Sequence, residues 1–104
     1  MSIKRINSAV RKYLQKVKKS GISVTKAYIF GSQIKGKTRY GSDIDLCIIS
    51  PLFGKDRQQE RIMLMNLRDE TSDIIEPHPY SPLDFQKTFD SLSYEIKKTG
   101  IIVV

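Results

Sequence analysis

The sequence predicts an α/β (α+β) fold, in which a small mixed sheet of about four strands has helices packed against it. Its 104 residues and 11.9 kDa leave room for one domain of ordinary size, and 39% hydrophobic residues can supply its core. Segments with helical and strand periodicity follow in the order helix, strand, strand, helix, strand, helix, strand. This alternation favours a sheet covered by helices.

The segment before Gly21 predicts an amphipathic helix, because apolar residues recur in it at intervals of three and four: Ile3, Ile6, Val10, Leu14 and Val17. It also carries seven basic residues and no acidic one, whereas the rest of the chain has eleven of each sign. The whole net charge of +7 therefore lies on this helix. A solvated face explains the charge, and a docking surface for an acidic partner or a phosphate backbone is the alternative.

The next two elements are strands. Residues 24–30 (VTKAYIF) and 43–50 (DIDLCIIS) are rich in β-branched and aromatic residues, and a loop with three glycines and three cations separates them. Pro51 and Gly54 close the second strand with a turn.

The second half of the chain alternates helix and strand. A helix is expected over about 57–70, and a third, extended strand over 73–77, where a proline follows. The inner stripe of that helix is expected to contain Ile62, Leu64, Met65 and Leu67. The Ser81-Pro82 step marks the start of another helix, with a break near Asp90. It ends at Gly100, and a short strand over 101–104 follows.

Several protein classes are excluded by the composition. The longest apolar runs are about four residues, far short of a membrane span, and the N-terminus lacks the apolar run of a signal peptide, so a soluble cytoplasmic protein is expected. A single cysteine, Cys47, allows neither an internal disulfide nor a cysteine metal site. The P-loop pattern G-x-x-x-x-G-K-[ST] is absent, and one histidine between two prolines gives thin support for a hydrolytic triad.

Two aspartates in the second predicted strand are candidate metal ligands. Asp43 and Asp45 alternate with Ile44, so both project from one face, about 7 Å apart along the backbone. Two close carboxylates repel each other unless a cation lies between them, and hard oxygen ligands of this kind suit Mg²⁺. The alternative is a pair of solvated acids at the entry of the strand.

A glycine and a serine follow the first predicted strand directly. Gly31 lets a backbone N–H approach a phosphate closely, and the Ser32 hydroxyl adds a donor. Three cations, Lys35, Lys37 and Arg39, lie in the sequence between this pair and the aspartates. They would be close to a polyanion bound by the metal. Each of these cations could equally be part of a solvated loop.

The stretch FGSQIKGKTRYGSDIDL resembles the signature of the DNA polymerase beta-like nucleotidyltransferase superfamily. It is most similar to the minimal nucleotidyltransferases (MNT), whose pattern is G-S-x10-D-x-D, because ten residues lie between Ser32 and Asp43. The strings IEPHPYSPLDF and YEIKKTGIIV also resemble this family. The resemblance runs from about Tyr28 onward and implies that residues 1–104 form a single minimal nucleotidyltransferase domain with the polymerase beta-like fold.

The resemblance implies a two-metal transfer of a nucleotide. Asp43 and Asp45 would hold two Mg²⁺ ions, and Gly31 and Ser32 would bind the β and γ phosphates of an NTP, most simply ATP. An acceptor hydroxyl would attack the α-phosphate and release pyrophosphate. The other residues assigned to the nucleotide are Lys35, Lys37, Arg39 and Ser42.

Members of the superfamily use a third carboxylate from a neighbouring strand. Asp73 and Glu76 are the candidates, and in an extended strand they would face opposite sides. Glu76 is favoured because it lies in the IEPHP string, although many members have an aspartate here. His78 could face the site on the same side as Glu76, but its position between two prolines favours a structural role.

The minimal family usually acts with a separately encoded helical HEPN protein, as antitoxin and toxin. The resemblance therefore implies transfer of AMP to a hydroxyl of a HEPN partner. The first alternative is a non-catalytic module that binds a partner or RNA through the basic N-terminal helix. A transferase to a small alcohol such as an aminoglycoside is the second, and it would need dimerisation to form an acceptor pocket. Nucleic acid is not favoured as a partner, no membrane is expected, and a homodimer is left open.

Overall fold

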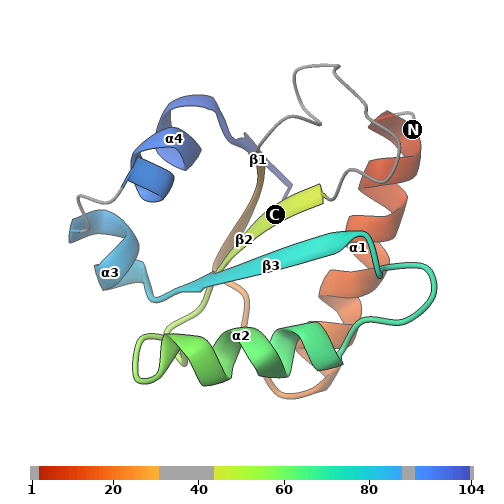
Figure 1. The fold of residues 1–104 in the computed structure, drawn as a ribbon, viewed down its shortest axis with the longest axis horizontal. Helices are drawn as coiled ribbons and strands as arrows, with labels where there is room; N and C mark the ends of the chain where they lie inside the picture. Colours follow the sequence, from red (N-terminus) through yellow and green to blue (C-terminus); the bar gives the residue numbers. More distant parts are fainter. Residues whose placement is uncertain (1–2, 31–43, 88–90, 104) are drawn as a thin grey trace.

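The computed structural model describes residues 3–30, 44–87 and 91–103, which form a four-stranded mixed sheet with helices on both faces (Figure 1). Its elements are α1 (Ile3–Lys19), β1 (Lys26–Phe30), β2 (Ile44–Ile49), α2 (Arg57–Asn66), β3 (Ile75–Tyr80), α3 (Pro82–Lys87), α4 (Ser91–Thr99) and β4 (Ile101–Ile102). The predicted fold class is confirmed, and the elements follow the predicted order, with two helices, α3 and α4, where one interrupted helix was expected. Among the residues named above, no helix is long and apolar enough to cross a membrane.

The strands lie in the order β3-β2-β1-β4. Strand β1 runs antiparallel to both β2 and β4, whereas β2 and β3 run parallel. A parallel pair needs a crossover connection, and α2 supplies it. The parallel pair carries the side chains of interest below.

Hydrophobic clusters cover both faces of the sheet. Along β2, Ile44, Leu46 and Ile48 join the cluster that contains the apolar residues of α1 and Leu64 of α2. Cys47 and Ile49 point the other way, into the cluster with residues of α3 and α4. Both faces of β2 are therefore buried over most of its length, and Asp45 has the parity of Cys47.

Helix α1 packs by the residues that its periodicity predicts. Ile6, Val10, Leu14 and Val17 are all buried, while the side chain of Ile3 lies outside the described part. Gly21 follows the helix with a φ of 102°, a conformation that favours glycine. The predicted stop is thus explained by backbone geometry.

The third strand differs from the expectation, because it runs from Ile75 through both prolines to Tyr80. Among the described strands it lies at the edge of the sheet, and none of them pairs with its outer side. The carbonyls of Ile74 and Tyr80 accept hydrogen bonds from the β2 side, so the odd-numbered residues between them turn their backbone outward. Pro77 and Pro79 are odd-numbered, and at the open edge the N–H they lack is not needed.

Helix α2 is also shorter than expected. It ends at Asn66 rather than near residue 70, because the Asp69 side chain accepts hydrogen bonds from Thr71 and organises turns there. Leu64 is fully buried, but Ile62 is 42% exposed, so the predicted inner stripe was wrong at that position.

The C-terminal elements begin and end near the predicted residues. The Asp84 N–H donates to Ser81 Oγ at 3.0 Å, which supports the predicted start of α3 at Pro82. The Gly100 N–H donates to the Ile96 carbonyl at 2.8 Å, at the end of α4. Residue Asp90, where a break was expected, lies outside the described residues.

A buried hydrogen bond joins α1 and α2, whose apolar residues belong to the same hydrophobic cluster. Tyr13 of α1 is 1% exposed and donates its hydroxyl to the Leu64 carbonyl of α2. Burial raises the pKa of Tyr13, so the phenol stays a neutral donor. Leu67 N–H also donates to this carbonyl, so loss of the tyrosine hydroxyl would not leave it without a donor.

We expect Tyr13→Phe to lower the free energy of unfolding by about 1 kcal/mol, the usual net contribution of such a bond. Urea denaturation would measure the change. Tyr94→Phe is the matched control, because Tyr94 is 64% exposed, and it should leave stability unchanged. Equal effects of the two substitutions would contradict the role of the buried hydroxyl.

The carboxylate of Asp69 joins α1 to the turns before β3. Lys16 Nζ lies 2.9 Å from Asp69 Oδ2, and both side chains are nearly half exposed. The hydrogen bond from Lys16, followed by those from Thr71, holds the pKa of Asp69 well below its usual range.

The pKa shift of Asp69 predicts a pH-dependent stability contribution. A carboxyl whose pKa is lower in the folded state adds stability above its unfolded pKa of about 3.9 and loses it as the pH falls toward the folded value. Asp69→Asn should therefore lower the melting temperature slightly at pH 7, and by less as the pH drops below about 4. Thermal denaturation across this range measures it, and a difference that grows toward pH 3 would contradict the prediction.

Candidate active site

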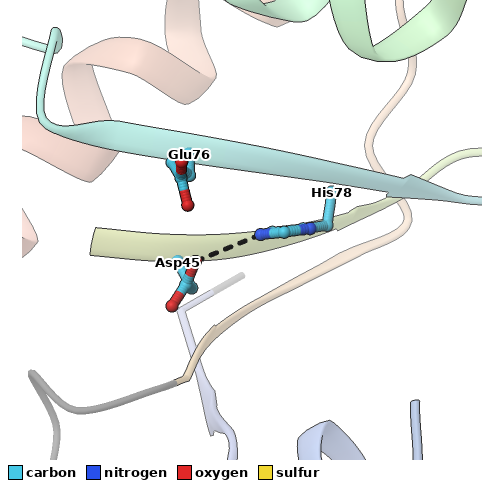
Figure 2. A group of neighbouring side chains, drawn as sticks. All are labelled: Asp45, Glu76 and His78. Carbon is cyan, nitrogen blue, oxygen red and sulfur yellow. Dashed lines mark hydrogen bonds and ion pairs between the residues drawn. The ribbon is translucent and has the colours of Figure 1, made fainter. Parts of the chain in front are cut away.

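Two acidic residues face each other across the parallel strands. In the register of β2 and β3, Asp45 pairs with Glu76, and Cys47 pairs with His78. Residues 76 and 78 share a face of β3 because side chains alternate along a strand. Two carboxylates and one imidazole, from Asp45, Glu76 and His78, thus come together at one place on the sheet (Figure 2).

The three side chains are close enough to share one ion. A carboxylate oxygen of Asp45, one of Glu76 and a ring nitrogen of His78 all lie within 4.8 Å of one another. His78 Nε2 lies 3.1 Å from Asp45 Oδ1, the contact drawn as a dashed line in Figure 2. The side chains of His78 and Asp45 are 14% and 28% exposed. They are reachable from solvent but are partly removed from its dielectric screening.

This arrangement fits a divalent cation. Two carboxylates held this close repel each other, and a cation bound between them would offset that repulsion. Oxygen ligands from two carboxylates are what Mg²⁺ takes in phosphoryl-transfer sites, where substrate phosphates complete its shell. A histidine nitrogen is an additional ligand that many divalent transition ions accept.

His78 is held in place by its surroundings. Its ring lies 5.2 Å from the Phe30 ring, at an interplanar angle of 57°. Pro77 and Pro79 on either side are fully buried and fix the backbone. The sequence leaves two roles open for this histidine, a structural one and a place on the same side as Glu76, and the structure brings it into contact with Asp45. The signal was its spacing of two from Glu76.

The two candidates for the third carboxylate are separated by the start of β3. Glu76 lies inside the strand and opposite Asp45. Asp73 is exposed and precedes the strand, and it is not among the residues that gather around Asp45. The geometry thus puts Glu76, and not Asp73, beside the aspartate.

The other predicted site residues lie outside the described residues: Gly31, Ser32, Lys35, Lys37, Arg39, Ser42 and Asp43. The residues that flank this segment are described. Phe30 ends β1 opposite Asp45, and Ile44 begins β2 one residue before it. The two residues that flank segment 31–43, Phe30 and Ile44, are therefore both next to Asp45 in the sheet.

A groove of about 470 Å³ adjoins His78 at the open edge of β3. Its lining includes three residues of the first turns of α2, Arg57, Gln58 and Arg61, together with Pro79 and Leu92. The Arg57 guanidinium lies 4.0 Å from the centre of the Tyr80 ring. Arg57 and Arg61 give the lining of this groove positive charge. The same groove reaches His78, the histidine that contacts Asp45.

Cys47 takes no part in this group of ligands. It is fully buried on the Asp45 face of β2, and burial raises the pKa of its thiol to about 12. A thiol that stays protonated at neutral pH is a poor metal ligand.

Comparison with known proteins relates the chain to enzymes that transfer nucleotides. Residues 9–104 match the family model described as "Polymerase beta, Nucleotidyltransferase". Among solved structures, a candidate nucleotidyltransferase from Sulfolobus solfataricus has a similar fold, with a TM-score of 0.65 and 15% sequence identity. The match covers 94% of this chain and 78% of that one. No curated protein matches the chain.

The close carboxylates predict a stability gain when one charge is removed. Two unit charges within 4.8 Å repel by about 1 kcal/mol even in water, so Glu76→Gln should raise the free energy of unfolding by about that amount in EDTA. Adding Mg²⁺ should stabilise the unmodified protein and not this variant. Chemical denaturation with and without Mg²⁺ measures both effects.

Asp73→Asn is the matched control, because it removes an exposed carboxylate outside the group. It should change neither the stability in EDTA nor the response to Mg²⁺. If Glu76→Gln is destabilising in EDTA and still responds to Mg²⁺, the carboxylates do not form a cation site.

Proposed function

The chain belongs to the polymerase beta nucleotidyltransferase family, and on this premise we propose that it transfers AMP from ATP to a hydroxyl group of a helical HEPN partner. In this proposal the chain is the antitoxin of a toxin–antitoxin pair. The resemblance of its motifs to the minimal nucleotidyltransferases supports this narrower assignment.

The observation that carries the proposal is the pairing of Asp45 with Glu76 across β2 and β3. In the proposal, Asp43, Asp45 and Glu76 are the metal ligands and catalytic carboxylates. Bound divalent ions would stabilise the attacking and leaving oxygens of the transfer. The protein's part is to hold these ligands at fixed positions on a sheet that is packed on both faces.

The proposed triphosphate site is the segment between β1 and β2. Gly31 and Ser32 would bind phosphate oxygens through backbone and hydroxyl donors. The remaining residues proposed for the nucleotide are Lys35, Lys37, Arg39 and Ser42. Support comes from Phe30 and Ile44, which anchor both ends of the segment beside Asp45.

The acceptor hydroxyl is proposed to approach over the open edge of β3. The groove beside His78 gives a partner's side chain room there, and His78 lies in the same group as Glu76. Arg57 and Arg61 line the groove, so it suits a partner segment with acidic residues near its acceptor hydroxyl. A homodimer is not needed for this route.

The test of the proposal is to incubate the protein with labelled ATP, Mg²⁺ and its co-encoded partner. We expect label on the partner and a loss of at least a hundredfold in rate for Asp45→Asn, because a metal ligand that stabilises developing charge is removed. Asp73→Asn should label at the unmodified rate. Equal labelling by Asp45→Asn and the unmodified protein would refute the proposal.

The rival function is a module that binds RNA or an acidic partner through α1 without catalysis. Its support is the row of exposed basic residues on that helix, among them Arg11, Lys12, Lys18 and Lys19. Such a surface needs neither Asp45 nor Glu76.

Thermal denaturation separates the two functions. Catalysis predicts that Mg·ATP raises the melting temperature of the unmodified protein and not of Asp45→Asn, because a ligand stabilises the state that binds it. The binding module predicts no Mg·ATP shift. It predicts instead RNA or partner binding that weakens steeply with salt and is lost in a Lys12→Gln, Lys19→Gln variant.

A further inference from the structure

We propose that His78 is a ligand of the ion held by Asp45 and Glu76, and that it makes this position prefer a divalent first-row transition ion to Mg²⁺. The proposal rests on the function proposed above, because it concerns the metal site of that reaction. It adds a nitrogen ligand to a site for which the sequence predicted carboxylates alone.

The distances agree with ligation of a common ion. When ligand bonds are roughly 2.1 Å long and meet at right angles, neighbouring ligand atoms of one ion lie roughly 3 Å apart. His78 Nε2 and Asp45 Oδ1 are 3.1 Å apart. The three ligand atoms all lie within 4.8 Å of one another, so small side-chain rotations would bring Glu76 to the same ion.

The imidazole is positioned before any ion binds. The neighbouring Phe30 ring and the two buried prolines restrict its movement, and Nε2 already faces the carboxylate (Figure 2). A ligand that is fixed in advance loses little conformational entropy on binding. With an exposed fraction of 14%, the ring is also accessible to an ion from solvent.

The mixed set of ligands changes the preferred metal. Carboxylates alone suit Mg²⁺, whereas imidazole adds affinity chiefly for transition ions such as Fe²⁺, Co²⁺ and Zn²⁺. Cys47 is fully buried and is not among the three side chains that gather here, so no sulfur ligand competes. The selectivity of the site should therefore depend on His78.

The competing explanation is that His78 only donates a hydrogen bond to Asp45 and so positions it. A positioning residue would affect all ions that Asp45 binds to the same extent. A ligand would affect ions that accept nitrogen more than it affects Mg²⁺. The experiment therefore needs a direct signal from the nitrogen and a comparison between metals.

The direct measurement is electron spin-echo modulation of Mn²⁺ bound to the full, untagged chain. His78 is the only histidine in the sequence, so any modulation from an imidazole nitrogen must come from it. We expect this modulation in the unmodified protein and its absence in His78→Gln. Asp45→Asn should abolish Mn²⁺ binding, which shows that the ion is at this site.

The second measurement is the affinity for Co²⁺ and for Mg²⁺ by calorimetry. His78→Gln keeps a hydrogen-bond donor, and we expect it to weaken Co²⁺ binding tenfold or more and Mg²⁺ binding less than threefold. Asp73→Asn should leave both affinities unchanged. Equal losses for the two metals, or Mn²⁺ bound without imidazole modulation, would overturn the proposal.

These experiments distinguish a failure of the His78 proposal from a failure of the proposed function. Loss of transfer in Asp45→Asn without an imidazole signal would leave the nucleotidyltransferase proposal standing and refute the role of His78. An imidazole signal in a protein that labels no partner would support the role of His78 and refute the proposed transfer to the partner.

Discussion

The parallel pairing of β2 with β3 is the constraint on which the candidate site depends. The register puts Asp45 opposite Glu76 and leaves His78 one pair further along the same face. A shift of one residue would turn Glu76 and His78 to the opposite face, where the cluster of α1 and α2 is packed. The ligand positions are therefore set by backbone hydrogen bonds, and not by the three side chains themselves.

The rest of the fold keeps this register in place. Hydrophobic residues cover β2 on both faces, so moving the strand would expose apolar surface or bury Asp45. Of the strands that the structure describes, only β2 pairs with β3, and the prolines of β3 discourage another strand from adding to its outer edge. The groove beside His78 is lined in part by two residues of this edge strand, His78 and Pro79. Repulsion between the paired carboxylates lowers the stability of the fold, and burial of apolar residues in the two hydrophobic clusters offsets this loss.

Local patterns in the sequence predicted much of this arrangement. Alternation along β2 separates Asp45 from Ile44, Leu46 and Ile48, and the same rule puts Glu76 and Asp73 on different sides. The His78 contact was not predicted, because it depends on the register between two strands that are far apart in the sequence. The length of β3 was underestimated because prolines usually end a strand, and the sequence does not reveal which strand lies at an edge. The exposed position of Ile62 likewise depends on how α2 meets the sheet.

Anomalous diffraction from crystals grown with Mn²⁺ and a non-hydrolysable ATP analogue would test the central claim most directly. We predict an anomalous peak within bonding distance of both Asp45 and Glu76, with the triphosphate next to it. A peak elsewhere, or carboxylates that remain turned away from the ion and the nucleotide, would contradict it.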